Sequence, residues 1–186
     1  MADGIKRLDD ATRPEPPDLG EVTAAQKVPG AHLKLIHDQH RRAMAMIGQL
    51  IDEIESGVAE AGAVASDIQS LEMTQNLRRF GTLCGQHCQF IHGHHSIEDA
   101  YMFPELAGKA EAFARVIDRL IEEHSVIHAL LMRLVGEINE LGENPTAERF
   151  RAARATYGEL ERLLQSHFVY EEDSIGDALG VFGVGI

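Results

Sequence analysis

Residues 117–141 read IDRLIEEHSVIHALLMRLVGEINEL. The apolar residues of this segment recur at spacings of three and four, which is typical of an amphipathic helix that buries one face. His124 and His128 fall on the same apolar face. A buried imidazole needs partners for its nitrogens, so two histidines at positions suited to leucine indicate that the helical core has a chemical purpose.

The rest of the chain has the same helical period in three more segments, and no segment alternates like a strand. A capping box at residues 66–69 predicts the start of the second helix, and Asn144 with Pro145 is expected to supply the cap and first-turn proline of the fourth. The expected helices cover residues 31–57, 67–104, 109–142 and 145–175. Short connections between four such helices predict an all-α fold, an antiparallel up-down four-helix bundle.

The two ends of the chain have a different composition from the helical part. Residues 1–30 contain Pro14, Pro16, Pro17 and Pro29 among charged and small residues, so they are expected to form a flexible N-terminal arm. The bundle is expected over residues 31–180, with glycine-rich, irregular chain from Gly176 and a short C-terminal tail at 181–186.

Charge and composition exclude several classes of partner. The 186 residues include 17 basic and 30 acidic side chains, and the net charge of −13 would repel nucleic acid and anionic membranes. No apolar run approaches the roughly 20 residues that cross a bilayer, and the acidic start does not resemble a secretory signal. We therefore expect a cytoplasmic protein. Cys84 and Cys88 are expected to stay reduced and to pack in the core.

Three pairs of potential metal ligands have a spacing of four residues. Residues four apart on a helix project from one face, one turn from each other, so both members of a pair can reach one centre. A single pair of this kind is common by chance, whereas three pairs on three successive apolar stripes indicate a metal site. The pairs are His94-x-x-x-Glu98, His124-x-x-x-His128 and His167-x-x-x-Glu171.

With these pairs, the chain resembles the hemerythrin-like, or His-His-Glu, family. The ligand pattern of that family is a lone histidine followed by the three pairs in this order. The resemblance spans residues 33–179 and includes the word HHSIED at 94–99, Phe103-Pro104, and Glu171-Glu172 after His167.

The resemblance implies a non-haem centre of two iron ions bridged by two carboxylates and by an oxo or hydroxo group. Three histidines would complete six ligands on one iron, whereas two would leave the other with five and one position open to a small molecule. The implied metal ligands are His37, His94, Glu98, His124, His128, His167 and Glu171.

Two of these ligand assignments have alternatives. His40 also lies on the first helix, and the word DQHR at 38–41 resembles the equivalent word of the oxygen carriers, although the height of His37 along the helix favours His37. On the fourth helix, the oxygen carriers place an aspartate five residues after the histidine, and that position here is Glu172. The remaining histidines are expected to have lesser roles: His87 as a hydrogen-bonded core residue, and His32, His92 and His95 as exposed or supporting residues.

The implied function is binding of, or reaction with, dioxygen, hydrogen peroxide or nitric oxide at the open iron position. Decomposition of peroxide, which is a catalase-like activity, is the enzymatic form of this hypothesis. The alternatives are a non-catalytic module that senses oxygen or iron or stores iron, and, less favoured, repair of iron–sulfur clusters. The sequence points to no particular electron donor or oligomeric state.

Overall fold

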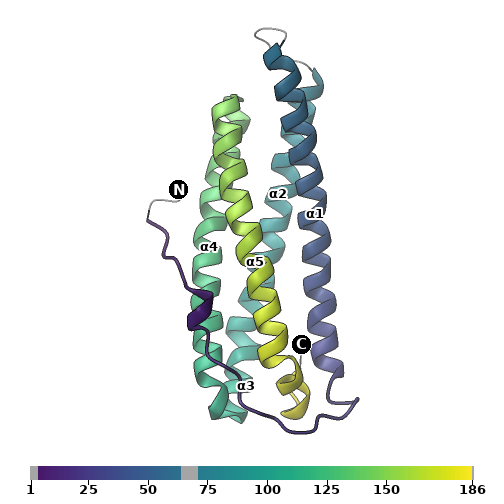
Figure 1. Ribbon diagram of the computed structural model, residues 1–186, viewed down its shortest axis with the longest axis vertical. Coiled ribbons are helices and arrows are strands. Elements are labelled where there is room, and N and C mark those ends of the chain that lie inside the picture. The colour runs from purple at the N-terminus through teal and green to yellow at the C-terminus, as the bar shows by residue number, and fades with distance from the viewer. Residues whose placement is uncertain (1–3, 64–70, 186) are drawn as a thin grey trace.

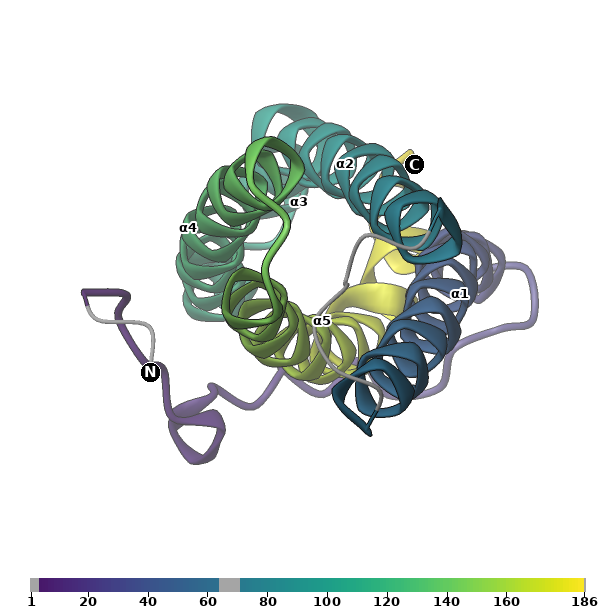
Figure 2. The ribbon, with the colours of Figure 1, turned by 90° about the horizontal axis from the view of Figure 1, so that it is seen from above.

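The computed structural model describes residues 4–63 and 71–185, and in them four long helices lie side by side (Figure 1). Viewed along its long axis, the bundle is a ring in which each helix has two neighbours (Figure 2). The predicted helical bundle is confirmed, and the described part of the chain contains no strand. The long helices are α1 (Val28–Ala63), α2 (Leu71–Ile97), α4 (Ala114–Glu143) and α5 (Ala147–Val181).

The second helix of the bundle changes its geometry near its end. After α2, a single π-helical turn, η2 (Glu98–Met102), leads into the short helix α3 (Phe103–Lys109). The backbone N–H of Phe103 donates to the carbonyl of Glu98, five residues back. Pro104 has no N–H and its ring crowds the preceding turn, so a wider turn before it keeps the helix continuous. This turn begins at a candidate metal ligand.

Several helix ends differ from the sequence prediction. The helix α1 continues six residues past Gly57, and α5 continues through Gly176 to Val181. The cap of α5 is Thr146, whose side chain accepts from the backbone N–H of Arg149 at 3.2 Å. The prediction of Asn144 as the cap and of Pro145 as a first-turn proline was therefore wrong, since both residues precede the cap. The predicted capping box at 66–69 lies outside the described residues.

The buried apolar side chains form two clusters at different heights of the bundle. On α1, the first cluster begins at Met44 and the second contains Leu33. On α5, the first cluster ends at Phe168 and the second begins at Ile175. The predicted ligands of each helix fall at or near the boundary between the clusters, so the histidine-rich layer has an apolar layer above it and another below it.

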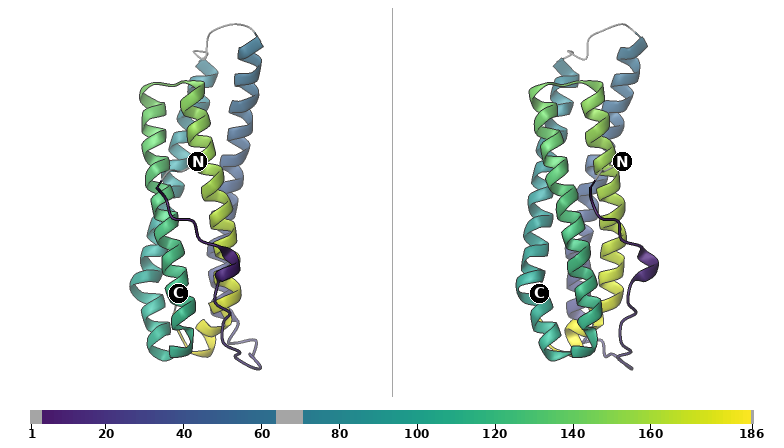
Figure 3. Two further views of the ribbon diagram at one scale, coloured as in Figure 1. Left: turned by 60° about the vertical axis from the view of Figure 1, so that its left-hand side comes forward. Right: turned by 90° about the vertical axis from the view of Figure 1, so that its left-hand side faces the viewer.

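The N-terminal segment, residues 4–27, runs along the outside of the bundle (Figure 3). It includes a 3-10 turn, η1 (Asp10–Thr12), and it contacts α4 and α5. A second 3-10 turn, η3 (Glu111–Phe113), precedes α4. Among the described residues, no helix combines the length and apolar character needed to cross a membrane.

Candidate metal centre

Two groups of potential ligand atoms lie in the middle of the bundle. Within each group, one nitrogen or oxygen atom from every member lies within 4.8 Å of the others. The first group draws its members from α1, the α2–η2 segment and α5, and the second from α2, α4 and α5. The first group is His37, His94, Glu98 and Glu171, and the second is His95, His124 and His167.

The carboxylates of Glu98 and Glu171 connect the two groups. Glu98 places Oε1 3.2 Å from Nε2 of His94 and Oε2 3.7 Å from Nε2 of His124. Glu171 places Oε2 3.5 Å from Nε2 of His37 and 3.4 Å from Nε2 of His167. Each carboxylate therefore lies between one histidine of the first group and one of the second, which is the position of a bridging ligand.

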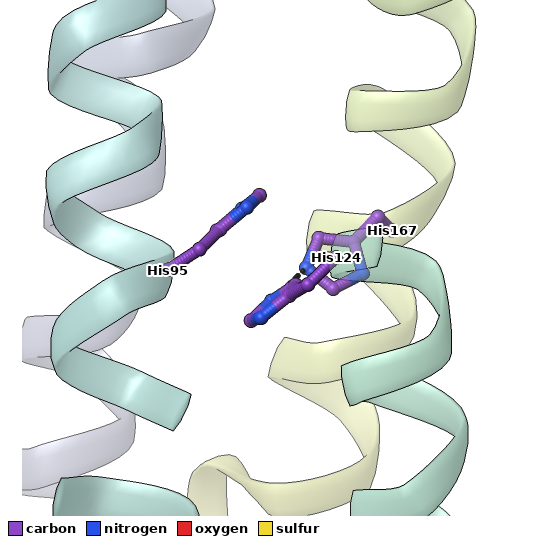
Figure 4. Close-up of side chains that lie close together, drawn as sticks. All are labelled: His95, His124 and His167. Atoms are coloured by element: carbon purple, nitrogen blue, oxygen red, sulfur yellow. Dashed lines mark hydrogen bonds between the residues drawn. The ribbon is translucent and has the colours of Figure 1, made fainter. Parts of the chain in front are cut away.

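The imidazole rings approach one another through their Nε2 atoms. Nε2 of His37 is 3.0 Å from Nε2 of His94, and Nε2 of His124 is 3.1 Å from Nε2 of His167. Two ligands at right angles, each about 2.1 Å from one ion, are about 3.0 Å apart. Figure 4 shows the rings of His95, His124 and His167 pointing toward one another from three helices.

Three of these histidines contact a carboxylate through Nδ1, the ring nitrogen that faces away from the other ligands. Nδ1 of His37 lies 2.9 Å from Glu172, Nδ1 of His124 lies 2.8 Å from Asp99, and Nδ1 of His167 lies 3.0 Å from Glu123. A carboxylate at Nδ1 fixes the ring and its tautomer and leaves the Nε2 lone pair for a metal.

The supporting carboxylates follow a regular pattern around the ring of helices. Each one is next to a ligand in the sequence but supports a histidine of the adjacent helix. Asp99 of η2 supports α4, Glu123 of α4 supports α5, and Glu172 of α5 supports α1. The supporting roles of Asp99 and Glu123 were not predicted from the sequence. The feature that could have indicated them is an acidic residue directly next to a predicted ligand, since Asp99 follows Glu98 and Glu123 precedes His124.

Unpaired buried polar atoms test whether these residues fit a metal. Several buried polar atoms have no hydrogen-bond partner among residues 4–63 and 71–185. They are both carboxylate oxygens of Glu98, both of Glu171 and both ring nitrogens of His95. Leaving such atoms unpaired costs about 1–3 kcal/mol each, and more for charged groups. A cation in each group would satisfy the four carboxylate oxygens and one nitrogen of His95, so the donor set fits a metal centre.

Three of the histidines are in the neutral form that binds metal. Burial lowers the pKa of His94 to about 3, and it lowers the pKa of His95 and of His124 below the ordinary value, so their rings are neutral near pH 7. His167 differs, because burial lowers its pKa but hydrogen bonds to Glu123 and Glu171 raise it by more, so that the net shift is upward. Burial raises the pKa of Glu98, and the charge of Glu171 raises it further. Burial opposes ionisation of Glu171 as well, but contact with His167 and the charges of nearby histidines lower its pKa to about 2.

The structure brings together six of the seven predicted ligands, and His128 is the one outside both groups. The His128 ring lies 4.8 Å from that of His92 and 5.5 Å from that of His95, and its Nε2 is buried without a partner. The third histidine of the second group is His95. The expectation of an exposed or supporting His95 was wrong about exposure, because the side chain is fully buried and stacks on His124 at 3.8 Å.

The two alternative ligands lie close to the centre but outside both groups. The ring of His40 is 5.2 Å from that of His94 and 5.7 Å from that of His87. Glu172 binds Nδ1 of His37 and accepts from Arg41 at 2.7 Å, so it supports a ligand from behind. The geometry thus favours His37 and Glu171 over these alternatives.

The fold and the site define a helical-bundle protein with a histidine- and carboxylate-rich metal centre. A family model described as the hemerythrin HHE cation-binding domain matches residues 31–179, and the chain belongs to this family. It is therefore a metal-binding, hemerythrin-like protein. Neither the curated proteins nor the solved structures that were searched gave a match.

Proposed function

We propose that the protein is a non-haem di-iron protein, built on an antiparallel up-down bundle, that binds or reacts with a small ligand at one open iron position. The observation that carries this proposal is the position of Glu98 and Glu171 between two histidine groups of unequal size. The ligand would be dioxygen, hydrogen peroxide or nitric oxide.

Counting ligands explains why one position would stay open. Two carboxylates and a small bridging group would give each ion three ligands. The three histidines of the second group would bring one ion to six ligands, whereas His37 and His94 would bring the other to five. When bound, the iron pair supplies electrons and Lewis acidity to a small molecule at the free position. The ligand set implied by the resemblance includes His128, whereas this count includes His95 instead. Both sets contain five histidines.

The surrounding side chains exclude water and restrict the size of the ligand. Phe168 stacks on His37 with ring centroids 4.2 Å apart, and Phe103 stacks on His124 at 5.4 Å. Both phenylalanines are fully buried, as is Ile91. Close-packed interiors leave few voids larger than a water molecule, so these walls favour diatomic and triatomic ligands.

The donor set alone is compatible with several metals. Imidazole and carboxylate ligands suit iron, manganese and zinc, so the proposal of iron rests on the family rather than on ligand softness. Five carboxylates lie among the ligands or directly against them, at Glu98, Asp99, Glu123, Glu171 and Glu172, and they would provide the negative charge that multivalent cations require.

Anaerobic loading with ferrous iron, followed by an iron count and oxidation, tests the proposal. We expect about two irons per chain and near-ultraviolet charge-transfer bands that change when azide is added. A larger anion should leave the bands unchanged. A matched variant, Glu171→Gln, should lose iron, while Glu161→Gln, on the same helix but above the centre, should keep it. An iron-free, colourless preparation would refute the assignment.

Hydrogen peroxide tests whether the iron-loaded protein reacts with a small ligand or only binds it. We expect the loaded protein to evolve oxygen from hydrogen peroxide, azide to inhibit this, and His167→Ala to abolish it. If iron binds but azide has no effect and no oxygen evolves, the site is coordinatively closed, and a storage or sensing function replaces the redox one.

A further inference from the structure

The N-terminal segment reaches the back of the metal centre, although it lies outside the family match that begins at residue 31. In Figure 3 it descends across α4 and α5 before it turns into α1. Two contacts of this segment are side-chain pairs near its start: Lys6 with Glu122, and Arg7 with Glu159 at 3.8 Å. In both pairs the basic side chain is exposed. The contacts of Arg13 are different, because its partner Glu123 is buried inside the bundle.

Arg13 binds Glu123 through two parallel hydrogen bonds. Nε donates to Oε1 at 2.8 Å, and Nη2 donates to Oε2 at 3.1 Å. Arg13 also donates to Oγ of Ser166 at 2.8 Å and lies over the ring of Tyr170 at 4.7 Å. The Glu123 side chain is only 1% exposed and that of Arg13 is 13% exposed. A bidentate arginine contact of this kind has a fixed geometry as well as a charge.

Glu123 transmits this contact to the centre. Its Oε2 accepts from Nδ1 of His167 at 3.0 Å, and His167 is a member of the second ligand group. In the part of the chain that the structure describes, Oε2 of Glu123 has one hydrogen-bond partner besides His167, and that partner is Nη2 of Arg13.

Arg119 holds the same arrangement from α4. Its Nε donates to Oε1 of Glu123 at 2.8 Å, while its other nitrogens donate to the backbone oxygen of Asp9 at 2.9 Å and to Oγ1 of Thr12 at 3.0 Å. One arginine thus binds both the segment and the carboxylate. The hydroxyl of Tyr170 completes the attachment by donating to the backbone oxygen of Pro14 at 2.9 Å.

We propose that Arg13 is a positioning residue of the metal centre, and that residues 9–14 act as a strap that completes the support of His167 through Glu123. The proposal rests on the proposed metal-binding function. Without Arg13, the Arg119 contact reaches only Oε1, so the carboxylate can rotate about that contact and Oε2 no longer has a fixed position for His167. The ring then loses its preferred orientation and its single tautomer. The strap lies outside residues 31–179, which the family model matches.

The test compares full-length variants by the rate of iron release to a chelator. Arg13→Gln should release iron about tenfold faster than the unchanged protein, as loss of a supporting contact to a ligand does. Arg13→Lys keeps the charge but not the two parallel bonds, so it should restore only part of the retention. Arg7→Gln is the matched control, because Arg7 lies on the same segment with a 73% exposed side chain and no path to the centre.

A second readout uses the metal-free protein and does not depend on iron. Contacts with Glu123 and Glu171 outweigh burial and raise the pKa of His167, so nitrogen NMR of its ring is recorded at a pH high enough to keep the ring neutral. It should then show one tautomer, protonated at Nδ1, in the unchanged protein and in Arg7→Gln. In Arg13→Gln it should show a mixture at an unchanged global fold. A purely structural strap would change the melting temperature and leave the tautomer alone.

The outcomes separate this inference from the proposed function. If the unchanged protein binds no iron, the proposed function fails and the NMR comparison still decides whether Arg13 positions His167. If iron binds but Arg13→Gln and Arg7→Gln release it equally, Arg13 has no role at the centre. If Arg13→Gln releases iron faster but its His167 tautomer is unaltered, the strap slows iron release without positioning His167. That result would also overturn the proposal.

Discussion

At the scale of single residues, adjacent histidines on one helix serve different halves of the site. His94 belongs to the first ligand group and His95 to the second. Neighbouring residues on a helix point about 100° apart. The helix α2 has a neighbour on each side, α1 and α4, so its buried arc is wide enough to include both. A sequence prediction that gives each helix one narrow buried face identifies His94 as a ligand but leaves His95 outside that face.

Substitution of His95 and of His128 distinguishes the geometric ligand set from the one that the resemblance implies. We expect His95→Leu to lower iron content and to raise the chelator release rate more than about tenfold, because a ligand is lost. His128→Leu should retain most of the iron, since it removes only a half-buried ring next to His92 and His95. Metal analysis of both purified variants is the measurement. The reverse order would return His128 to the centre.

The same comparison applies to His37 and His40 on α1. His37 is fully buried, 3.0 Å from His94, and held by Glu172, so His37→Leu should abolish the azide-sensitive spectrum. His40→Leu should leave a near-native spectrum, because His40 is outside both ligand groups. Loss of iron in His40→Leu alone would exchange the two assignments.

At the scale of elements, periodicity predicted the four long helices because each buries one apolar face. It did not predict where they end, since an apolar stripe can stop while backbone hydrogen bonding continues, as α1 does past Gly57. Nor did it predict the contact between Arg13 and Glu123, which are 110 residues apart in sequence. Ligand pairs within one turn were accessible from sequence, whereas contacts between elements were not.

Glycine positions near the ends of the helices give a test of close packing between elements. A Cβ on Gly180 of α5 would lie 1.7 Å from the backbone oxygen of Gln26, so Gly180→Ala must push the N-terminal segment away. We expect a loss of about 1–3 kcal/mol in the free energy of unfolding. Gly136 is an exposed helical position seven residues before the end of α4, and among the described residues a Cβ there meets nothing within 4 Å, so Gly136→Ala should gain about 0.5–1 kcal/mol. Urea titration measures both, and equal effects would contradict the close approach at Gly180.

At the scale of the whole molecule, buried histidines make the stability of the metal-free protein depend on pH. Burial lowers the pKa of His87 to about 4 from its ordinary value of 6.5. A group whose pKa is lowered by folding contributes stability above its unfolded pKa and loses it as the pH falls through the folded value. The window for His87 therefore runs from about pH 6.5 down to about pH 4.

Replacing His87 should reduce this pH dependence. Between pH 7 and pH 4, we expect His87→Leu to lose less free energy of unfolding than the unchanged protein, by on the order of 2–3 kcal/mol. His32→Gln is the control, because His32 is exposed and should leave the pH profile unaltered. Identical acid profiles for all three proteins would contradict burial of a neutral His87.

Metal binding should determine how stable the bundle is as a whole, because the ligands come from all four long helices and the η2 turn. In the metal-free protein, the oxygens of Glu98 and Glu171 are buried together without hydrogen-bond partners, which opposes folding. Free iron at about 100 times its dissociation constant adds about 2.7 kcal/mol, and for a chain of this size that raises the melting temperature by about 5–10 °C.

The variant Glu98→Gln should separate two contributions to stability. Burial of Glu98 beside Glu171 destabilises the metal-free protein, whereas iron binding stabilises the protein. The amide removes the electrostatic conflict with Glu171, so the metal-free variant should melt no lower than the metal-free unchanged protein. It also removes a bridging carboxylate, so the rise on adding iron should largely disappear. Calorimetry of both proteins with and without iron measures the four melting temperatures. An undiminished rise in Glu98→Gln would show that iron binds elsewhere, and the two groups of ligand atoms would then owe their arrangement to packing alone.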